Sequence, residues 1–238
     1  MTVLQRKTVG AGLLSLALIL GTWISPGPVA GGKYPAEIEN LPPITIVKDG
    51  QARHLALTDV FEFYGNSCMS SSSAFLATSH GLRVLFGDEP ADLADLVIVT
   101  PSAGGSIDFL DLLMRDDPRQ RTWPPAGISG GADNFVFQFY RKSTMQGVIV
   151  KYKDGLWPAD WFDLRAKQKA GTITDAERQR RVEARRLVQE VFPTMAPEDL
   201  FETSDVFTFV SWGHINPGEL DRLGREQRRA ARAQAAEQ

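Results

Sequence analysis

Cysteine is almost missing from this sequence. Cys68 is the one cysteine in 238 residues, so no disulfide can form within the chain. A lone thiol in an oxidising compartment is a liability unless it is buried, paired with another chain or used in a site. The sequence leaves these three readings of Cys68 open.

The sequence also lacks an excess of charge of either sign. Its net charge is -3 and its pI is about 5.7, so we expect no nucleic-acid partner. No internal repeat at the period of a solenoid or propeller stands out. With 43% hydrophobic residues, the chain has enough apolar material for one globular domain with a real core.

The first 31 residues are typical of a secretory signal peptide. Arg6 and Lys7 precede an uncharged, mostly apolar run over residues 9–24, and small residues near Gly31 offer a cleavage site. We therefore predict export, with a periplasmic or secreted location. An uncleaved anchor is the alternative, and it is the one contact with a membrane that we expect.

Residues 70–86 predict a long helix that is largely buried. Small and apolar side chains follow one stripe at helical spacing, with larger apolar residues beside it: Ala74, Ala77, Gly81 and Leu85, then Phe75, Leu82 and Phe86. The small residues indicate a close approach to a sheet or to another helix. Ser73, His80 and Arg83 share the remaining polar side, where we expect His80 to be a surface residue.

Strand patterns lie before and after this helix. We expect strands at 44–47, 54–57, 96–99, 135–140, 147–152 and 206–212, a short helix or turn at 58–62, and further helices at 107–114, 157–170 and 174–192. The pattern predicts an α+β domain over residues 32–216, with an antiparallel or mixed sheet packed against the long helix and the further helices. A charged tail, helical or disordered, is expected at residues 217–238.

A loop that contains glycine, residues 101–106, joins an expected strand to a helix N-terminus. Backbone N–H groups at such a junction can face an anion, although the residues of a P-loop or a dinucleotide fingerprint are missing. Asp108 lies in the first turn of that helix, where it can cap the helix or serve a pocket. Asp111 and Arg115 are four residues apart and predict a solvated ion pair.

Three motifs lie around the start of the long helix. Residues 64–68 read Tyr-Gly-Asn-Ser-Cys, Asp108 follows Gly105 by three residues, and residues 127–134 read Gly-Ile-Ser-Gly-Gly-Ala-Asp-Asn before a hairpin. This layout resembles the family named for the E subunit of formylmethanofuran dehydrogenase. In that family the first motif is histidine-glycine-histidine, any residue, cysteine; the second has a cysteine three residues before an aspartate; and the third is glycine-rich.

The resemblance covers residues 57–206 and includes Arg141 at the hairpin turn and the Pro-Glu-Asp-Leu-Phe run at 197–201. It implies an α+β core with an antiparallel sheet against helices. It also implies a possible homodimer, because the family often forms dimers. No cysteine follows Cys68 in this sequence, so we do not expect the C-terminal zinc finger of some members.

Four metal-type positions of the family are changed in this sequence, and they hold Tyr64, Asn66, Gly105 and Ile128. A zinc or iron site needs three or four ligands, mostly thiolate or imidazole. Cys68 would therefore need a distant histidine, His54 or His214, to bind a metal ion. A metal cofactor stays open on these grounds, and the sequence identifies no other cofactor.

We expect first of all an accessory protein that binds a small-molecule ligand in a pocket at the start of the long helix. The candidate contacts are Tyr64, Asn66, Ser67, Cys68, Ser70, Asp108, Ser129 and Asn134. One alternative is an enzyme with Cys68 as nucleophile, because a helix N-terminus favours a thiolate. The other is a metal site formed by Cys68, a distant histidine such as His214, and a carboxylate.

Overall fold

The computed structural model describes residues 32–126, 128, 131–210, 225, 229, 232 and 233. Its helices are α1 (Ala36–Glu39), α2 (Leu57–Tyr64), α3 (Met69–Phe86), α4 (Gly105–Met114), α5 (Trp161–Ala170), α6 (Asp175–Arg186) and α7 (Pro197–Leu200). Its strands are β1 (Ile44–Lys48), β2 (Gln51–Leu55), β3 (Ala91–Asp92), β4 (Leu96–Val99), β5 (Val136–Arg141), β6 (Gln146–Tyr152), β7 (Phe201–Thr203) and β8 (Phe207–Thr208). The expected signal peptide, Ser129 and His214 lie outside the described residues.

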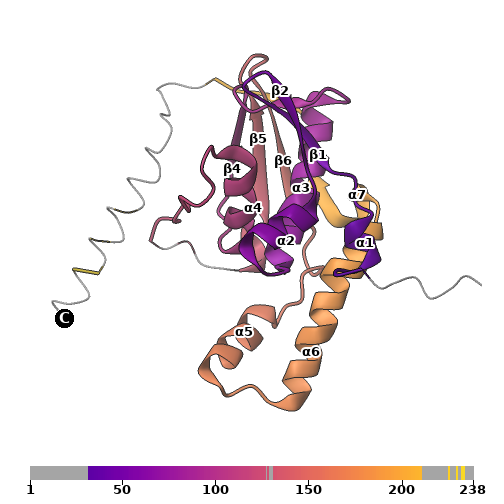
Figure 1. Ribbon diagram of the computed structural model, residues 1–238, viewed down its shortest axis with the longest axis vertical. Coiled ribbons are helices and arrows are strands. Elements are labelled where there is room, and N and C mark those ends of the chain that lie inside the picture. Colours follow the sequence, from indigo (N-terminus) through magenta and orange to yellow (C-terminus); the bar gives the residue numbers. More distant parts are fainter. Residues whose placement is uncertain are drawn as a thin grey trace, which may run out of the picture. The chain divides into compact units, whose positions relative to one another are not determined.

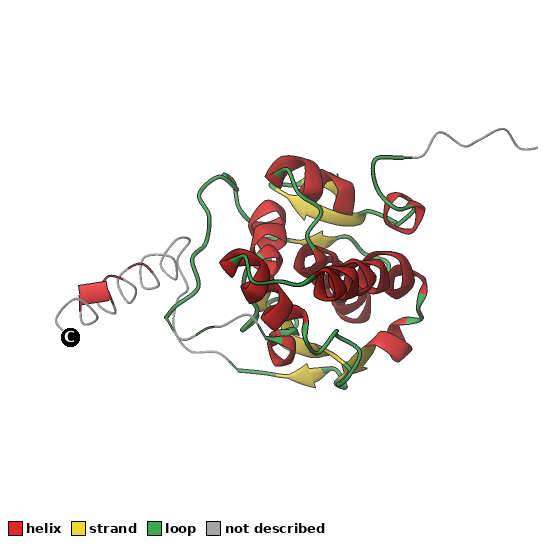
Figure 2. Cartoon of the chain, turned by 90° about the horizontal axis from the view of Figure 1, so that it is seen from below, coloured by secondary structure: helices red, strands yellow, loops and turns green. Residues whose placement is uncertain are grey.

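The strands form two sheets, which confirms the α+β fold class. β1 pairs with β2 in antiparallel and with β3 in parallel orientation, while β4, β5, β6 and β7 follow one another in an antiparallel sheet that β8 joins at β6. Figure 1 shows β4, β5 and β6 side by side. In the view from below, strands lie on both sides of the helices (Figure 2).

The long helix α3 is the centre of the core. It packs on β5 and β6 through one side and on α4 through another. Gly81 lies directly on the ring of Phe139, because a Cβ added at Gly81 would be 2.3 Å from a ring carbon. The small-residue stripe therefore does allow the close approach that the sequence indicates. Ser73, which we expected on the polar side, is fully buried, and its backbone C=O accepts a hydrogen bond from Tyr152 Oη.

Several boundaries differ from the sequence-based expectations. The strand β2 ends at Leu55, and Leu57 already starts α2. The helix expected at 174–192 ends its α-helical part at Arg186 and continues as the π-helical η2 (Leu187–Val191) and the 3-10 η3 (Phe192–Thr194). The short strands β3 and β7 were not predicted, because two or three residues are too few for a period to show.

The helices α5 and α6 form a pair that follows the β6 strand in the chain (Figure 1). A capping box starts α6: Glu177 N–H donates to Thr174 Oγ1 at 3.3 Å, and Thr174 N–H donates to Glu177 Oε2 at 2.9 Å. The Arg181 guanidinium of α6 stacks on the Trp161 ring of α5, 4.6 Å from its centre. Among the described helices, none has the length and apolar content to cross a membrane.

Candidate functional site

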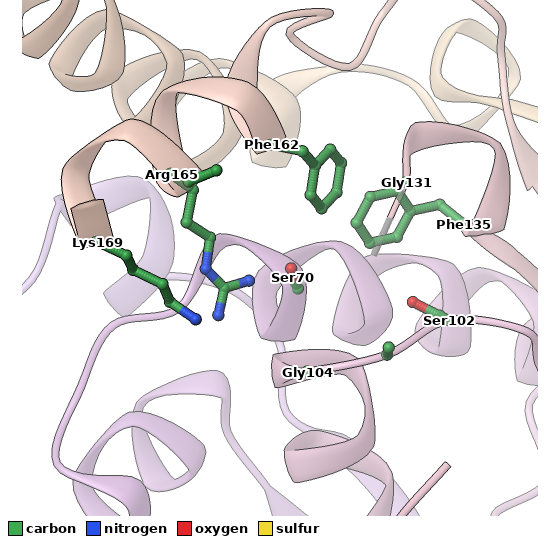
Figure 3. Close-up of a pocket in the computed structure, with 10 residues that line it drawn as sticks. Ser70, Ser102, Gly104, Gly131, Phe135, Phe162, Arg165 and Lys169 are labelled. Atoms are coloured by element: carbon green, nitrogen blue, oxygen red, sulfur yellow. The ribbon is translucent and has the colours of Figure 1, made fainter. Parts of the chain in front are cut away.

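A cavity of about 360 Å³ lies where the start of α3, the loop before α4 and one face of α5 meet. Figure 3 shows this region. Its lining combines hydroxyls, glycine backbone, two phenyl rings and two cations: Ser70, Ser102, Ala103, Gly104, Gly131, Phe135, Phe162, Arg165, Ala166 and Lys169. The size is near the lower end of the roughly 300–1,000 Å³ that ligand pockets usually have.

Two serines provide hydroxyl groups to the cavity. Ser70 is 7% exposed, and its hydroxyl has no hydrogen-bond partner among the described residues. In Figure 3 the Ser70 oxygen points toward the space beside Arg165 and Phe162. Ser102 donates to Ser106 Oγ at 2.8 Å, and Ser106 in turn donates to the Ser70 C=O at 3.2 Å. The Ser70 oxygen is not among the fully enclosed side-chain atoms that lack a partner, so it reaches the cavity, where a ligand or water can accept its hydrogen bond.

Two helices begin at this cavity. Ser70 is the second residue of α3, and Gly104 precedes α4 with φ 67 and ψ -127, a conformation that glycine adopts at little cost. The first N–H groups of a helix have no partner within it and carry the positive end of its dipole. The starts of α3 and α4 are held together, since Ser71 Oγ donates to the Gly105 C=O at 2.8 Å. The local field therefore favours a negative group.

The helix α5 brings two cations to the same cavity. Arg165 and Lys169 are exposed, lie one turn apart, and form no ion pair with a described residue. By contrast Lys167, on another side of the helix, pairs with Glu177. The pKa of Arg181 is lowered, first by burial and then by the nearby Arg185 and Arg165 cations. Positive charge thus accumulates beside the cavity, and no described carboxylate lines it.

Aromatic rings form the other end of the cavity. The ring centres of Phe135 and Phe162 are 6.5 Å apart with 33° between their planes, and Figure 3 shows them beside each other. Trp157 supports both rings from behind, with its ring centre 4.2 Å from Phe135 and 6.3 Å from Phe162. These contacts fix the orientation of the apolar wall.

Cys68 occupies a different position from the cavity lining. It is the N-cap residue of α3 and is half-buried. Its Sγ lies against the first residue of α4, because a Cβ added at Gly105 would be 2.3 Å from the sulfur. The thiol therefore fills the space that a side chain at position 105 would need.

Asp108 and Tyr64 belong to a polar cluster beyond Cys68. Arg121 Nη2 forms an ion pair with Asp108 Oδ1 at 2.7 Å. Burial raises the pKa of Asp108, the Arg121 cation opposes this, and the Asp111 carboxylate adds to it. Burial, followed by Asp111 and Asp108, raises the pKa of Tyr64 to about 12. Tyr64 donates a long hydrogen bond of 3.4 Å to the Pro118 C=O.

The prediction that Asp111 forms a solvated ion pair is wrong about its exposure. It is 3% exposed rather than solvated, although the expected pair exists, with Arg115 Nε 2.8 Å from Asp111 Oδ1. Asp111 also accepts from Thr122 N–H at 2.7 Å, so it anchors the loop that follows α4. The carboxylate of this ion pair is buried, and the Arg115 side chain is 23% exposed.

The remaining candidate contacts are dispersed. Asn66 is exposed and donates to the Tyr64 C=O at 3.1 Å. Ser67 Oγ lies 3.5 Å from Arg185 Nη1, which links the start of α3 to α6. Asn134 belongs to the short 3-10 turn η1 (Ala132–Asn134), and its Nδ2 would lie 3.8 Å from a Cβ on Gly131 in the cavity lining. The structure describes seven of the eight candidate contacts, and of these seven only Ser70 lines the cavity.

The histidines have other partners. His54 shares a hydrogen bond of 3.0 Å with Thr45 on the β1–β2 hairpin. His80 is half-buried, shares a hydrogen bond of 2.9 Å with Thr203, and stacks on Phe201. Within the described part of the chain, no three His, Cys, Asp or Glu side chains come together in a way that could hold a metal ion.

Sequence reasoning missed the residues of α5 and of the aromatic wall. The signal was present in part, since Phe162, Arg165 and Lys169 follow one another at spacings of three and four on one helix face. This spacing shows that they share a face, but it does not show what the face covers. The sequence does predict that the loop at 101–106 can face an anion, without singling out Ser102 or Gly104.

No family model matches the chain, and no curated protein matches it. Among solved structures, the chain is similar to a tungsten formylmethanofuran dehydrogenase FmdE-like protein from Syntrophus aciditrophicus, with 14% identity and a TM-score of 0.35. The aligned region covers 70% of this chain and 74% of that chain. Family membership stays a prediction of the sequence motifs.

Proposed function

We propose that this protein binds a small anion in the cavity between the starts of α3 and α4 and the face of α5. The observation that carries the proposal is Ser70, a residue that is 7% exposed and whose hydroxyl faces the cavity without a hydrogen bond to a described residue. A donor placed there is satisfied when a ligand accepts its hydrogen bond.

The charges around Ser70 support an anion rather than a neutral ligand. Arg165 and Lys169 form no ion pair with a described residue, and the first N–H groups of two helices lie at the same cavity. A guanidinium binds a carboxylate or a phosphate through paired N–H groups, while an ammonium acts as a point charge. Because both cations are exposed, their attraction for the ligand is expected to weaken as salt is added.

The proposal gives this chain a binding role, in line with the expected accessory protein. The predicted export of the protein depends on residues that the structure does not describe, so it stays a prediction. The possible homodimer is likewise a prediction of the sequence resemblance.

The enzyme hypothesis is less well supported. A cysteine nucleophile needs a base beside the thiol. Of the described histidines, His54 is engaged on the β1–β2 hairpin, and His80 follows Cys68 by twelve residues, about 18 Å along the helix axis. The metal hypothesis depends on His214, which lies outside the described residues.

The test is a titration of the protein with acetate and with inorganic phosphate at low ionic strength, followed by NMR shifts of backbone amides. We expect the shifts to concentrate at the starts of α3 and α4. Ser70→Ala and Arg165→Ala should each weaken binding about tenfold, the order expected when a hydrogen bond to a charged group is lost.

Arg178→Ala is the matched control. Arg178 is exposed on α6, pairs with Asp175 at 3.1 Å and is absent from the cavity lining, yet its loss changes the net charge by the same amount. Equal affinity in the Arg165 and Arg178 variants would refute a specific anion site. So would the absence of any saturable shift for both anions.

A further inference from the structure

The cavity has two chemically different ends, and this difference narrows the class of ligand. Phe135 and Phe162 form the apolar end, while Arg165 and Lys169 reach in from the next turns of α5 (Figure 3). The Ser70 hydroxyl lies between the two ends, as seen in the same view. An inorganic ion would contact the cations and the hydroxyl and would leave the rings facing water.

We infer that the ligand is a one-ring aromatic acid, with its anionic group toward Arg165 and Lys169 and its ring against Phe135 and Phe162. This inference depends on the proposed anion site and specifies the rest of the ligand. Trp157 packs against both phenyl rings, with its ring centre 4.2 Å from that of Phe135 and 6.3 Å from that of Phe162. Aromatic groups gain from tilted or offset contact with such rings.

The size of the cavity agrees with one ring and a head group. An apolar cavity of about 150 Å³ holds one benzene molecule. The cavity here has about 360 Å³, which leaves space for a carboxylate or phosphate and a few waters. The head group can be of either kind, since both present the paired oxygens that a guanidinium recognises.

The spacing of three residues on α5 places the apolar end and the cationic end of the cavity on one helix face. Phe162, Arg165 and Lys169 lie at positions i, i+3 and i+7 of one helix, so a single face carries the ring contact and both cations. The helix α5 is connected to α6 by Trp161 and Arg181 and to the core by the contacts of Phe162. A ligand that bridges both ends would therefore contact α3, α5 and the loop before α4 at once.

The experiment compares benzoate and phenyl phosphate with acetate, inorganic phosphate and uncharged benzamide, by NMR titration of the protein. We expect each aromatic acid to bind at least about tenfold more tightly than the matching anion without a ring, which is about 1.4 kcal/mol. Benzamide should bind more weakly than benzoate. The ratio of benzoate to phenyl phosphate affinity then identifies the preferred head group.

Variants at the two ends separate the contributions. Phe162→Leu keeps an apolar side chain and should reduce the advantage of benzoate over acetate with little effect on acetate itself. Arg165→Ala should weaken both. Thermal melting of each variant shows whether it is folded, and Phe162→Ile is a second variant at the ring position if the first is not.

The outcomes distinguish this inference from the proposal on which it rests. If acetate and phosphate bind but the aromatic acids bind no better, the aromatic class is wrong and the anion site stands. If none of the anions binds, the anion site itself is wrong. An advantage of benzoate that survives unchanged in Phe162→Leu also overturns the assignment of the ring to this wall.

Discussion

The contact between Gly81 and Phe139 offers a sharp test of how α3 is held on the sheet. A Cβ added at Gly81 would lie 2.3 and 2.4 Å from two ring carbons of Phe139, whereas carbon atoms normally pack at about 3.5–4.0 Å. Phe139 is 0% exposed, so its ring cannot turn toward solvent. We predict that Gly81→Ala destabilises the protein although alanine is the better helix former.

Two opposing effects set the magnitude. Alanine in place of glycine within a helix gains about 1 kcal/mol of helix propensity. Overpacking a filled core costs about 1–3 kcal/mol, and an overlap of more than about 1 Å with a fixed ring corresponds to the upper part of that range. The expected net loss is about 1–2 kcal/mol, which lowers the melting temperature by about 2–8 °C for a protein of this size.

Urea unfolding measures the loss of unfolding free energy, provided that the dependence of this free energy on urea concentration has the same slope in both proteins. Val84→Ala is the control, because Val84 is exposed on the same helix and its change should stay within about 0.5 kcal/mol. Phe139→Leu removes ring atoms, so the double variant Gly81→Ala/Phe139→Leu should lose less than the sum of the single losses, by about 1 kcal/mol. A stabilised Gly81→Ala, or strict additivity, would refute the reasoning.

Two further predictions concern electrostatics and capping. Burial raises the pKa of Asp108, so the folded protein holds this proton more tightly than the unfolded chain and loses stability as the pH rises through the folded-state pKa. Asp108→Asn should therefore flatten the fall of the unfolding free energy as the pH rises above about 4, the ordinary pKa of an aspartate. A constant offset from the unsubstituted protein in urea titrations across this range would contradict the prediction. Thr174→Ala removes the hydrogen-bond acceptor for Glu177 N–H. Amide hydrogen exchange in the first turn of α6 should therefore become faster, by an amount equivalent to about 1 kcal/mol. Unchanged exchange in this turn would show that the capping box of Thr174 and Glu177 does not stabilise the helix.

The periodic parts of the sequence predicted the fold well. The buried helix, the hairpin of β5 and β6, and the strand β4 all carry a long stretch of clear pattern or a short run of β-branched residues between turns. The positions that differed depend on tertiary contacts. Ser73 has a polar side chain on a helix that is covered on nearly every side, and Asp111 is buried because Thr122 and Arg115 satisfy its carboxylate.

Only one part of the candidate site could be predicted from the sequence, namely the start of α3 and the loop before α4. Ser70 and the loop at 101–106 adjoin helix starts, and the chemistry of a helix start can be read from sequence. Arg165 and Lys169 come from a separate helix that follows the β5–β6 hairpin. Their role depends on which face α5 turns to the core, and a weakly amphipathic, highly charged segment does not specify that face.

The packing of Cys68 against Gly105 shows why the two positions depend on each other. The resemblance expects a cysteine at both positions, which would suit two ligands of one metal ion. Here a Cβ at position 105 would lie 2.3 Å from Cys68 Sγ and 2.9 Å from Ser71 Oγ, so a larger residue at 105 would displace both side chains from their present positions. The short distance also allows Ser71 Oγ to donate to the Gly105 C=O at 2.8 Å. Glycine at position 105 and the close contact of the two helix starts therefore belong together, and that contact places both sets of first-turn N–H groups beside the cavity.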